Sequence, residues 1–245
     1  MIKLVKRFIL NTTSKVKLIY LSSGKGTVCP VCQWQGRDYD RVQGRGKPAV
    51  NPKCPACGSS PRHRLAYLLL SELLPLHAKK TLHFAPEKCI APWLKRISDD
   101  YLSVDLSSPR AMRHMDITAL DLPDNSFSLV WCSHVLEHIE ADHKAIAELF
   151  RVTQPGGLAV IMVPIYGPNT YEDPTIQSPA ERLKHFMQTD HVRLYGLDVQ
   201  QRLLRAGFDV ELKSISDLPD EVVQKYALDY PSTKEIFLCR KGSIN

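Results

Sequence analysis

Two closely spaced pairs of cysteines constrain this chain more than any other feature. The first pair reads Cys29-Pro-Val-Cys32, the second reads Cys54-Pro-Ala-Cys57, and 21 residues separate them. In each pair a tight turn lets two thiolates reach one ion from the same side, so the two pairs supply the four soft ligands of a tetrahedral zinc site. Four thiolates leave no open coordination position, and the predicted zinc is therefore structural.

Redox-active CxxC sites and disulfides are the alternatives to zinc. Redox sites normally occur singly near a βαβ pattern. The chain has seven cysteines, an odd number, and four of them fall in the two pairs instead of being scattered as in a secreted disulfide framework. This usage favours zinc and a reducing compartment, which we expect to be the cytoplasm.

Aromatic and basic residues lie between the two cysteine pairs. They are Trp34, Arg37, Tyr39, Arg41, Arg45 and Lys47. Such a mixture can bind nucleic acid by base stacking and phosphate contacts. A module this small has few other apolar residues to bury, so the sequence favours Trp34 and Tyr39 as its hydrophobic core.

Charge is divided unevenly along the chain. Residues 1–65 contain 13 Lys or Arg and 2 Asp or Glu, whereas residues 66–245 contain 19 and 24. The basic part predicts contact with an anionic partner such as RNA, another nucleic acid or an acidic protein, and a solvated surface is the alternative. Residues 1–24 read as a short basic helix or a disordered leader, not as a signal peptide. No apolar run approaches the roughly 20 residues that a membrane-spanning helix needs.

From residue 61 onward, short apolar runs alternate with helical patterns. A capped apolar helix over 59–75 connects this region to the cysteine module. Strands are predicted at 81–85, 101–104, 127–132, 158–163, 210–215 and 235–239, and helices around 90–97, 145–152 and 200–206. This alternation predicts a parallel sheet with helices on both faces. The predicted organisation is a basic segment at 1–24, a zinc ribbon at 25–60 and an α/β domain at 61–245.

Polar residues follow several of the predicted strands. Sheets of this kind bind ligands beyond the carboxyl ends of their strands. Asp105 follows the second strand, where a carboxylate can bind both hydroxyls of a nucleoside ribose. Asp116 lies further along, close to the expected position of an adenine ring, and residues 133–138 follow the strand at 127–132. We expect these three loops to line one crevice.

These residues resemble the class I S-adenosylmethionine-dependent methyltransferases, specifically the methyltransferase type 11 group and its zinc-ribbon-bearing members. The resemblance extends from about Thr81 to Val163 and has three elements in order: Asp116-Ile-Thr-Ala-Leu-Asp-Leu-Pro, Val135-Leu-Glu-His, and Arg151-Val-Thr-Gln-Pro-Gly-Gly. It implies a Rossmann-like seven-stranded methyltransferase sheet that binds S-adenosylmethionine. The cofactor-binding residues that it implies are His83, Phe84, Ala85, Glu87, Asp105, Leu106, Asp116, Ile117, Ser133 and His134.

The loop after the first strand departs from the family pattern. Members usually have an acidic residue and a glycine-rich loop there, whereas this chain reads His83-Phe-Ala-Pro-Glu87 without a glycine. Side chains must then leave room for the cofactor in another way, and Pro86 offers no N–H donor. Either the cofactor lies against Ala85 and Glu87 in an altered form, or its binding is weak or lost.

An insertion interrupts the alternation after the strand at 158–163. It contains Asn169-Thr-Tyr-Glu-Asp-Pro and His185-Phe-Met-Gln-Thr-Asp-His-Val-Arg-Leu-Tyr-Gly. In this architecture such an insertion arches over the crevice. The expected acceptor contacts are therefore Tyr171, Glu172, Arg193 and Tyr195, with His191 or His185 as a general base. The alternative is that Asp190, His191 and Arg193 only hold the insertion in place.

The sequence therefore predicts an S-adenosylmethionine-dependent methyltransferase that acts on a small molecule or an RNA. The alternative is a catalytically silent methyltransferase-like protein that binds nucleic acid or protein through its zinc ribbon and basic segment. A nicotinamide-dependent oxidoreductase is disfavoured because no GxGxxG follows the first strand.

Overall fold

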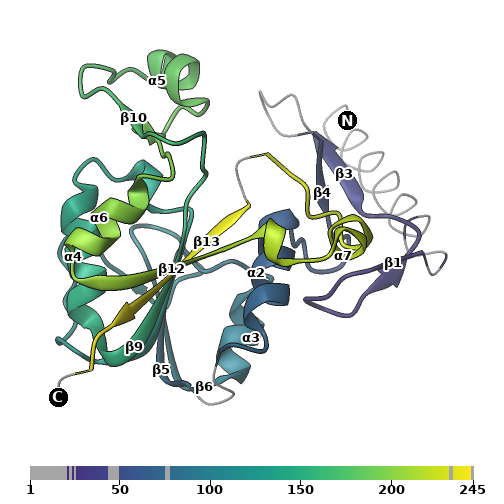
Figure 1. The fold of residues 1–245 in the computed structure, drawn as a ribbon, viewed down its shortest axis with the longest axis horizontal. Coiled ribbons are helices and arrows are strands. Elements are labelled where there is room, and N and C mark those ends of the chain that lie inside the picture. Colours follow the sequence, from purple (N-terminus) through teal and green to yellow (C-terminus); the bar gives the residue numbers. More distant parts are fainter. Residues whose placement is uncertain are drawn as a thin grey trace, which may run out of the picture.

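The computed structural model of this chain describes residues 21, 24, 26–43, 50–74, 78–231 and 234–243. Within them, a seven-stranded sheet of order β12-β13-β9-β8-β5-β6-β7 carries helices on both faces (Figure 1). The predicted Rossmann-like sheet is thereby confirmed. Most of the basic segment 1–24, and the loop that contains Arg45 and Lys47, lie outside the described residues.

The elements of this domain follow the predicted alternation closely. The strands of the sheet are β5 (Ala78–Phe84), β6 (Ser98–Asp105), β7 (Arg113–His114), β8 (Phe127–Ser133), β9 (Thr153–Met162), β12 (Phe208–Ser214) and β13 (Glu235–Lys241). The helices are α2 (Pro61–Leu70), α3 (Ala91–Arg96), α4 (Asp142–Val152), α6 (Val199–Arg205) and α7 (Asp220–Lys225), with short 3₁₀ turns η1 (Leu136–His138) and η2 (Ile215–Asp217).

The direction of β13 corrects the prediction of a parallel sheet. β13 pairs antiparallel with both of its neighbours, β9 and β12. The chain leaves β12 at Ser214 and re-enters the sheet at Glu235, which is the register partner of Ser214. Because η2 and α7 bring the chain back to the end of the sheet where it left, β13 has to run in the opposite direction.

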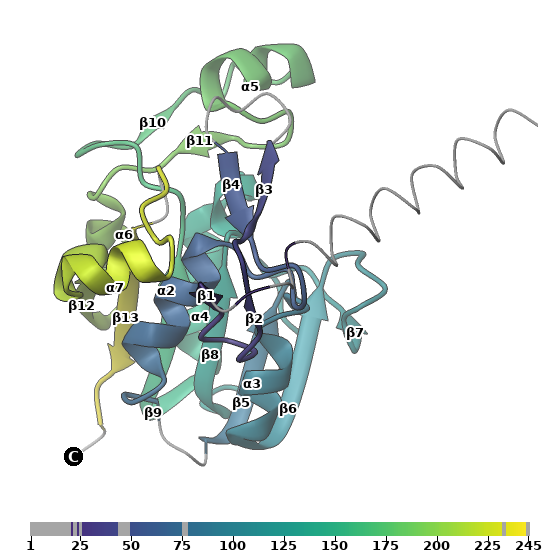
Figure 2. The same cartoon turned by 90° about the vertical axis from the view of Figure 1, so that its right-hand side faces the viewer.

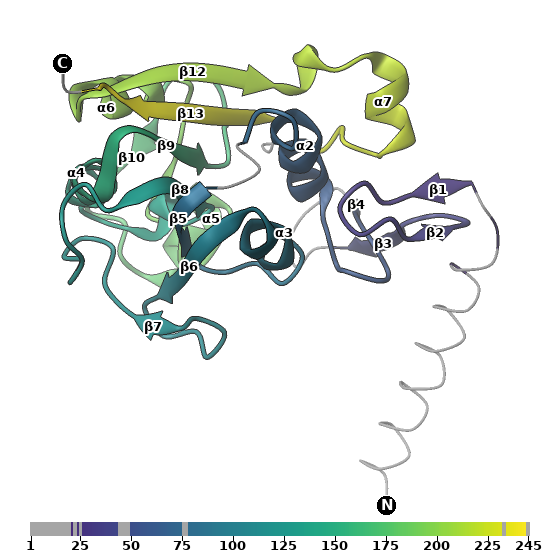
Figure 3. The same cartoon turned by 90° about the horizontal axis from the view of Figure 1, so that it is seen from below.

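Apolar side chains on both faces of the strands explain why helices cover the sheet twice. Along β8, Val130 and Cys132 join the core beneath α4 and α6, whereas Leu129 and Trp131 join the core beneath α2 and α3. Successive residues of a strand point to opposite faces, so an uninterrupted apolar run requires cover on each side. Figure 3 shows the resulting layers, with the cysteine module outside α2 and α3.

Helices α4 and α6 pack together on the face away from the cysteine module. The predicted apolar stripe of α4 is buried at Ala145, Ile146, Leu149 and Val152. Helix α6 ends before Gly207, whose φ of +105° and position against the Phe150 ring leave no room for a side chain. No helix in the described part of the chain has the length and apolar composition needed to cross a bilayer.

The insertion follows β9 and stands beyond the carboxyl ends of the parallel strands (Figure 1). Its short strand β10 (Tyr171–Glu172) pairs with β11 (Arg193–Leu194), and α5 (Pro179–Phe186) lies between them in the chain. The hydroxyl of Ser178 caps α5 by accepting a hydrogen bond from the Glu181 N–H at 3.2 Å. The insertion is therefore a folded unit at the end of the sheet where a ligand would enter.

The cysteine module consists of two short hairpins. β1 (Thr27–Val28) pairs with β2 (Gln35–Gly36), and β3 (Asp40–Gln43) pairs with β4 (Val50–Lys53). Tyr39 is buried between them beside the half-buried Trp34, and its hydroxyl donates to the Val28 carbonyl at 2.9 Å. The predicted role of these two aromatic residues as the module's core is confirmed.

Arg64 joins the module to the α/β domain. Its side chain is fully buried and its guanidinium carbon lies 4.0 Å from the centre of the Tyr39 ring. Its nitrogen atoms donate hydrogen bonds of 2.7 to 3.0 Å to four backbone carbonyls, those of Pro52, Ser59, Tyr226 and Ala227. One side chain of α2 thus contacts β4, the turn before α2 and the segment after α7.

We predict that Arg64→Met destabilises the protein by about 3 kcal/mol, because it removes the hydrogen bonds that Arg64 donates to four backbone carbonyls. Urea unfolding of the zinc-loaded chain measures this change. The control is Arg110→Met, at an exposed arginine, which we expect to change stability by less than about 0.5 kcal/mol. Equal stability of the two variants would show that Arg64 is not the link between module and domain.

Candidate functional site

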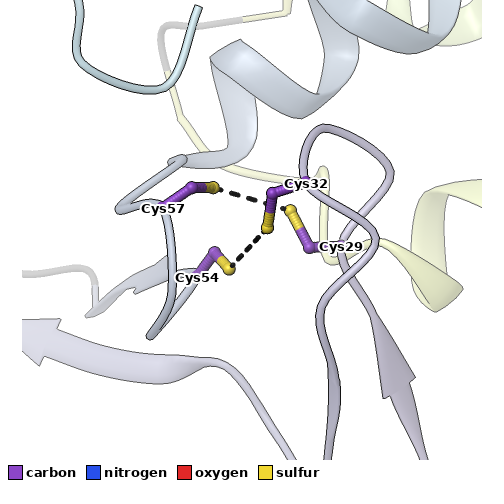
Figure 4. A group of neighbouring side chains, drawn as sticks. All are labelled: Cys29, Cys32, Cys54 and Cys57. Carbon is purple, nitrogen blue, oxygen red and sulfur yellow. Dashed lines mark hydrogen bonds between the residues drawn. The ribbon is translucent and has the colours of Figure 1, made fainter. Parts of the chain in front are cut away.

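The four paired cysteines converge on one point, although 21 residues separate the pairs in sequence. Their Sγ atoms all lie within 4.8 Å of one another, and Figure 4 shows the sulfurs directed toward a common centre. The Sγ atoms of Cys29 and Cys57 are 3.9 Å apart and those of Cys32 and Cys54 are 3.7 Å apart. Four sulfurs around a tetrahedral zinc at 2.3 Å stand about 3.8 Å from each other, so the geometry fits zinc.

Each cysteine pair lies in a tight turn that aims both sulfurs to the same side. In the first turn the Gln33 N–H donates to the Cys29 carbonyl at 2.9 Å, and Gln33 has a φ of 59°. In the second, the Gly58 N–H donates to the Cys54 carbonyl at 2.9 Å, and Gly58 has a φ of 76°. The two turns therefore repeat the same design with a left-handed residue after the second cysteine.

We predict about one zinc per chain by elemental analysis of the purified protein. Cys54→Ser removes one thiolate and should lose the metal and much of the stability, because metal binding and folding of such a module are coupled. Cys239→Ala is the control, since Cys239 lies in the core of the sheet away from the cluster. A folded, metal-free wild-type chain would contradict the zinc assignment.

The loops that follow β5, β6 and β8 meet at one end of the sheet. β5 lies between β6 and β8, and the chain continues from β5 toward β6 on one side and later adds β8 and β9 on the other. This reversal of strand order opens a crevice beyond the carboxyl ends of β5 and β8. The structure therefore brings together the four segments predicted to bind the cofactor, around Ala85, Asp105, Asp116 and Ser133.

Two carboxylates stand on the outer side of this crevice. Asp105 Oδ1 accepts hydrogen bonds from the N–H groups of Ser107 and Ser108 at 2.9 and 2.7 Å. Asp116 Oδ1 is held in the same way by Thr118, whose backbone hydrogen bond holds the pKa of Asp116 below its usual value. Neither Oδ2 atom has a hydrogen bond to any described residue, so each carboxylate is oriented and still has acceptor capacity.

Apolar surface lies beside these carboxylates. Leu106, which follows Asp105, is 71% exposed, and Ile117, which follows Asp116, is buried. A ribose needs hydrogen-bond acceptors and an adenine ring needs an apolar contact, and this end of the sheet offers both. The residues present therefore fit the nucleoside part of S-adenosylmethionine.

The glycine-free loop after β5 still makes a sharp turn. Ala85 takes the left-handed conformation that usually favours glycine, with a φ of 47°. His83 is fully buried, and its Nε2 lies 2.6 Å from Glu87 Oε2 while its Nδ1 lies 2.8 Å from the Tyr101 hydroxyl. His83 and Glu87, both predicted to bind the cofactor, thus contact each other beneath the loop.

Glu87 is a buried carboxylate that remains ionised. Burial opposes its ionisation, but the hydrogen bond with His83 and the proximity of His63 outweigh burial and hold the pKa of Glu87 well below its usual range. His63 comes from α2 and its Nε2 lies 3.7 Å from Glu87 Oε1. Burial lowers the pKa of His63 to about 4 despite this neighbour. A negative charge is therefore kept under the cofactor loop, although the loop lacks the acidic residue usual in the resembled family.

We predict that acid destabilises the protein partly through His63. The unfolded chain takes up a proton at His63 below a pH of about 6.5, whereas the folded chain resists protonation until a pH of about 4. Folding stability should therefore fall as the pH drops through this window. In His63→Gln the difference in unfolding free energy between pH 7 and pH 4.5 should shrink by roughly 2 kcal/mol, measured in urea. The exposed His114→Gln serves as the control, and an equal acid loss in all three chains would contradict the assignment.

A polar chamber of about 290 Å³ adjoins the crevice at the ends of β8 and β9. Four distant parts of the chain line it: the cysteine module with the start of α2, the residues after β8 and β9, the insertion, and the segment after α7. The lining residues are Asn51, Ser60, Pro61, Arg62, His134, Glu137, His138, Pro164, Gln188, His191 and Tyr230. Figure 2 shows the β3–β4 hairpin and the insertion at this same end of the sheet.

Histidines and one buried carboxylate form the wall of the chamber next to η1. Glu137 is 1% exposed, and its Oε1 lies 3.1 Å from Nδ1 of His134, which has a φ of 56°. Burial lowers the pKa of His134, which is therefore neutral at physiological pH. The rings of His138 and His191 meet edge to face at 4.8 Å. The ligating atoms of Glu137, His138 and His191 lie within 4.8 Å of one another, so this wall can also hold a metal ion.

The six residues predicted to contact or deprotonate the acceptor lie in three separate places in the structure. Of the six, His191 lines the polar chamber. Tyr171 and His185 lie on the outer side of the insertion, where the tyrosine hydroxyl is 2.9 Å from Nδ1 of the histidine. Glu172, Arg193 and Tyr195 belong to a charged network between the insertion and the helices.

That network fixes the insertion to α4 and α6. Glu172 accepts from Arg193 at 2.7 Å and from Arg202 at 2.8 Å, while the buried Tyr195 donates to Asp142 at 2.6 Å. The guanidinium of Arg193 also donates to the carbonyls of Leu136, Ile139 and Glu140. The open cavity beside it, about 990 Å³, is lined by charges of both signs. The alternative reading of Arg193 as a residue that holds the insertion in place therefore agrees with its contacts.

Comparison with known proteins adds sequence and fold relatives. A family model described as a methyltransferase domain matches residues 89–161. Over 56 residues the chain is 45% identical to a demethylmenaquinone methyltransferase of Renibacterium salmoninarum, a match covering 22% of this chain and 24% of that protein. Residues 89–161 are therefore similar to a methyltransferase domain.

Solved structures agree with this domain at the level of the fold. An S-adenosylmethionine-dependent methyltransferase of Mesorhizobium loti is 16% identical with a TM-score of 0.52, and the likeness covers 72% of this chain and 98% of that chain. The 4+2 cyclase SpnF is 14% identical with a TM-score of 0.54, covering 94% of this chain and 93% of that chain. The matches to curated relatives span only about a quarter of the length of those proteins. The methyltransferase domain is thus established as a fold, and its activity has to be argued from its site.

Sequence reasoning missed several residues of the polar chamber, among them Arg62, Gln188 and Tyr230. No sequence pattern links these residues, because they come from α2, the insertion and the segment after α7. Arg62 carried one signal, because it is one of two arginines in the first turn of a helix that is apolar further on.

Proposed function

We propose that the protein transfers a methyl group from S-adenosylmethionine to an acceptor bound in the polar chamber. The observation that carries this proposal is the position of the chamber, which adjoins the crevice of a methyltransferase domain at His134. The cofactor supplies a methyl group on a positively charged sulfur, so its transfer needs alignment and a dry site more than acid or base strength.

Different residues of the crevice would bind different parts of the cofactor. Asp105 would accept hydrogen bonds from the ribose hydroxyls, with Leu106 against the sugar and base. Asp116 and Ile117 would contact the adenine. Phe84, Ala85, Ser133 and His134 would line the methionine part, while His83 and Glu87 support the loop from beneath. The buried, unpartnered hydroxyl of Ser133 supports this role, because it still has a hydrogen bond to make.

The acceptor would lose a proton to a histidine if it is a hydroxyl or a protonated amine. His191 is the better-placed base because it lines the chamber, whereas His185 bonds to Tyr171 on the outer side of the insertion. Both assignments, and the contacts of the acceptor with Tyr171, Glu172, Arg193 and Tyr195, stay predictions from the sequence.

The cysteine module would have two roles. A zinc ion held by Cys29, Cys32, Cys54 and Cys57 would stabilise the module, and the module would in turn supply Asn51 and Ser60 to the chamber wall. Contact with RNA or another anionic partner through the basic part of the chain stays a prediction. The second candidate function is a catalytically silent binding protein, favoured by the glycine-free loop at His83 to Glu87.

We predict that Asp105→Ala weakens binding of S-adenosylhomocysteine about 100-fold without unfolding the chain, because two charge-assisted hydrogen bonds to the ribose are lost. Isothermal titration calorimetry measures the affinity. Asp209→Ala, at an exposed aspartate of β12, is the control and should bind like the wild type. No binding by the wild type at millimolar ligand would favour the silent protein, and unchanged affinity of Asp105→Ala would contradict the placement of the ribose.

A further inference from the structure

Arg62 is the one lysine or arginine among the described residues that line the polar chamber. It lies in the first turn of α2, directly after the cysteine module, and is half-buried. Its Nε atom is buried and donates no hydrogen bond within the described part of the chain. A buried guanidinium N–H without an acceptor is costly, and such groups are normally found where a ligand completes them.

The nearby carboxylates Glu87 and Glu137 make no ion pair with Arg62 within the described residues. Glu87 is held by His83 at 2.6 Å, and Glu137 lies 3.1 Å from His134. The arginine charge is nevertheless close to these groups, since it adds to burial in lowering the pKa of both His63 and His134. Arg62 therefore adds one permanent positive charge to a chamber that also holds the buried carboxylate of Glu137, whose pKa His134 keeps below its usual value against the effect of burial.

The remaining lining groups suit a small polar ligand. Asn51, Ser60 and Gln188 bring amide and hydroxyl groups to the walls, and the chamber volume of about 290 Å³ is at the lower end for small-molecule sites. A planar guanidinium recognises carboxylate and phosphate oxygens with two parallel hydrogen bonds.

The location of the chamber indicates whether the anionic group bound there would belong to the cofactor or to the methyl acceptor. Asp105 and Asp116, the residues suited to the nucleoside of the cofactor, follow β6 and β7 and do not line the chamber. The chamber lies on the other side of the crevice, at the ends of β8 and β9, where the module and the insertion close it. A group bound there belongs to the acceptor side of the site.

We propose that Arg62 binds a carboxylate or phosphate group of the methyl acceptor, and that the acceptor is a small anionic molecule. This proposal rests on the proposed methyltransferase function. The proposal gives the cysteine module and α2 a role in recognising the substrate. This role is additional to any structural role of the zinc.

The test uses the full zinc-loaded chain saturated with S-adenosylhomocysteine, titrated separately with inorganic phosphate and malonate and followed by NMR chemical shifts. Arg62→Gln should weaken binding of at least one of these anions about tenfold or more, and Arg62→Lys should restore part of it. Arg96→Gln, at an exposed arginine of α3, should bind both anions like the wild type. Circular dichroism confirms that each variant is folded.

Several outcomes would overturn the proposal. One is equal anion binding by wild type and Arg62→Gln, and another is the absence of anion binding by the wild type. A third is a loss of affinity for S-adenosylhomocysteine in Arg62→Gln with unchanged affinity for 5′-methylthioadenosine, which lacks the amino-acid carboxylate, because Arg62 would then bind the cofactor. If the wild type binds no S-adenosylhomocysteine, the methyltransferase function fails, and titration of the nucleoside-free protein with the same anions still decides whether Arg62 binds an anion.

Discussion

The burial of Arg64 is the interaction on which the arrangement of this molecule depends. A guanidinium removed from water is tolerable only if each N–H finds an acceptor, and here backbone carbonyls from three separate segments provide them. The same side chain stacks on Tyr39 in the core of the cysteine module. Satisfying one buried charge therefore places the module, α2 and the segment after α7 in a single arrangement, and the polar chamber lies where these parts meet the sheet.

In the resembled family an acidic residue and a glycine-rich loop follow the first strand, whereas this chain has His83 and Glu87 there and no glycine. The turn after β5 is made by Ala85 in a left-handed conformation, and the charge beneath it comes from Glu87. Two histidines stabilise that carboxylate, and one of them, His63, belongs to the helix that follows the cysteine module. The cofactor loop therefore contacts the helix that follows the module through a buried cluster of His63, His83 and Glu87.

The methyltransferase fold leaves the chemistry open. Structures with this fold include a methyltransferase and a cyclase, both at low sequence identity to this chain. The chamber of the present protein contains the Arg62 guanidinium, three histidines and a buried glutamate. Arg62 and His191 lie outside the matched residues 89–161, whereas His134, Glu137 and His138 lie within them.

The amino-acid sequence by itself determined the local features whose causes are local. Two CxxC pairs predicted the sulfur cluster, apolar runs such as 127–132 predicted buried strands, and Asp105 and Asp116 were expected at strand ends where the structure has them. Only the tertiary structure decided which polar side chains face the chamber. Arg193 and Tyr195 appeared equivalent to His191 in the sequence, yet they are bonded to α4, α6 and η1, whereas His191 lines the cavity. The physical reason is that a side chain's partners in a long-range polar network depend on how distant segments pack. That packing cannot be read from the periodicity of the sequence.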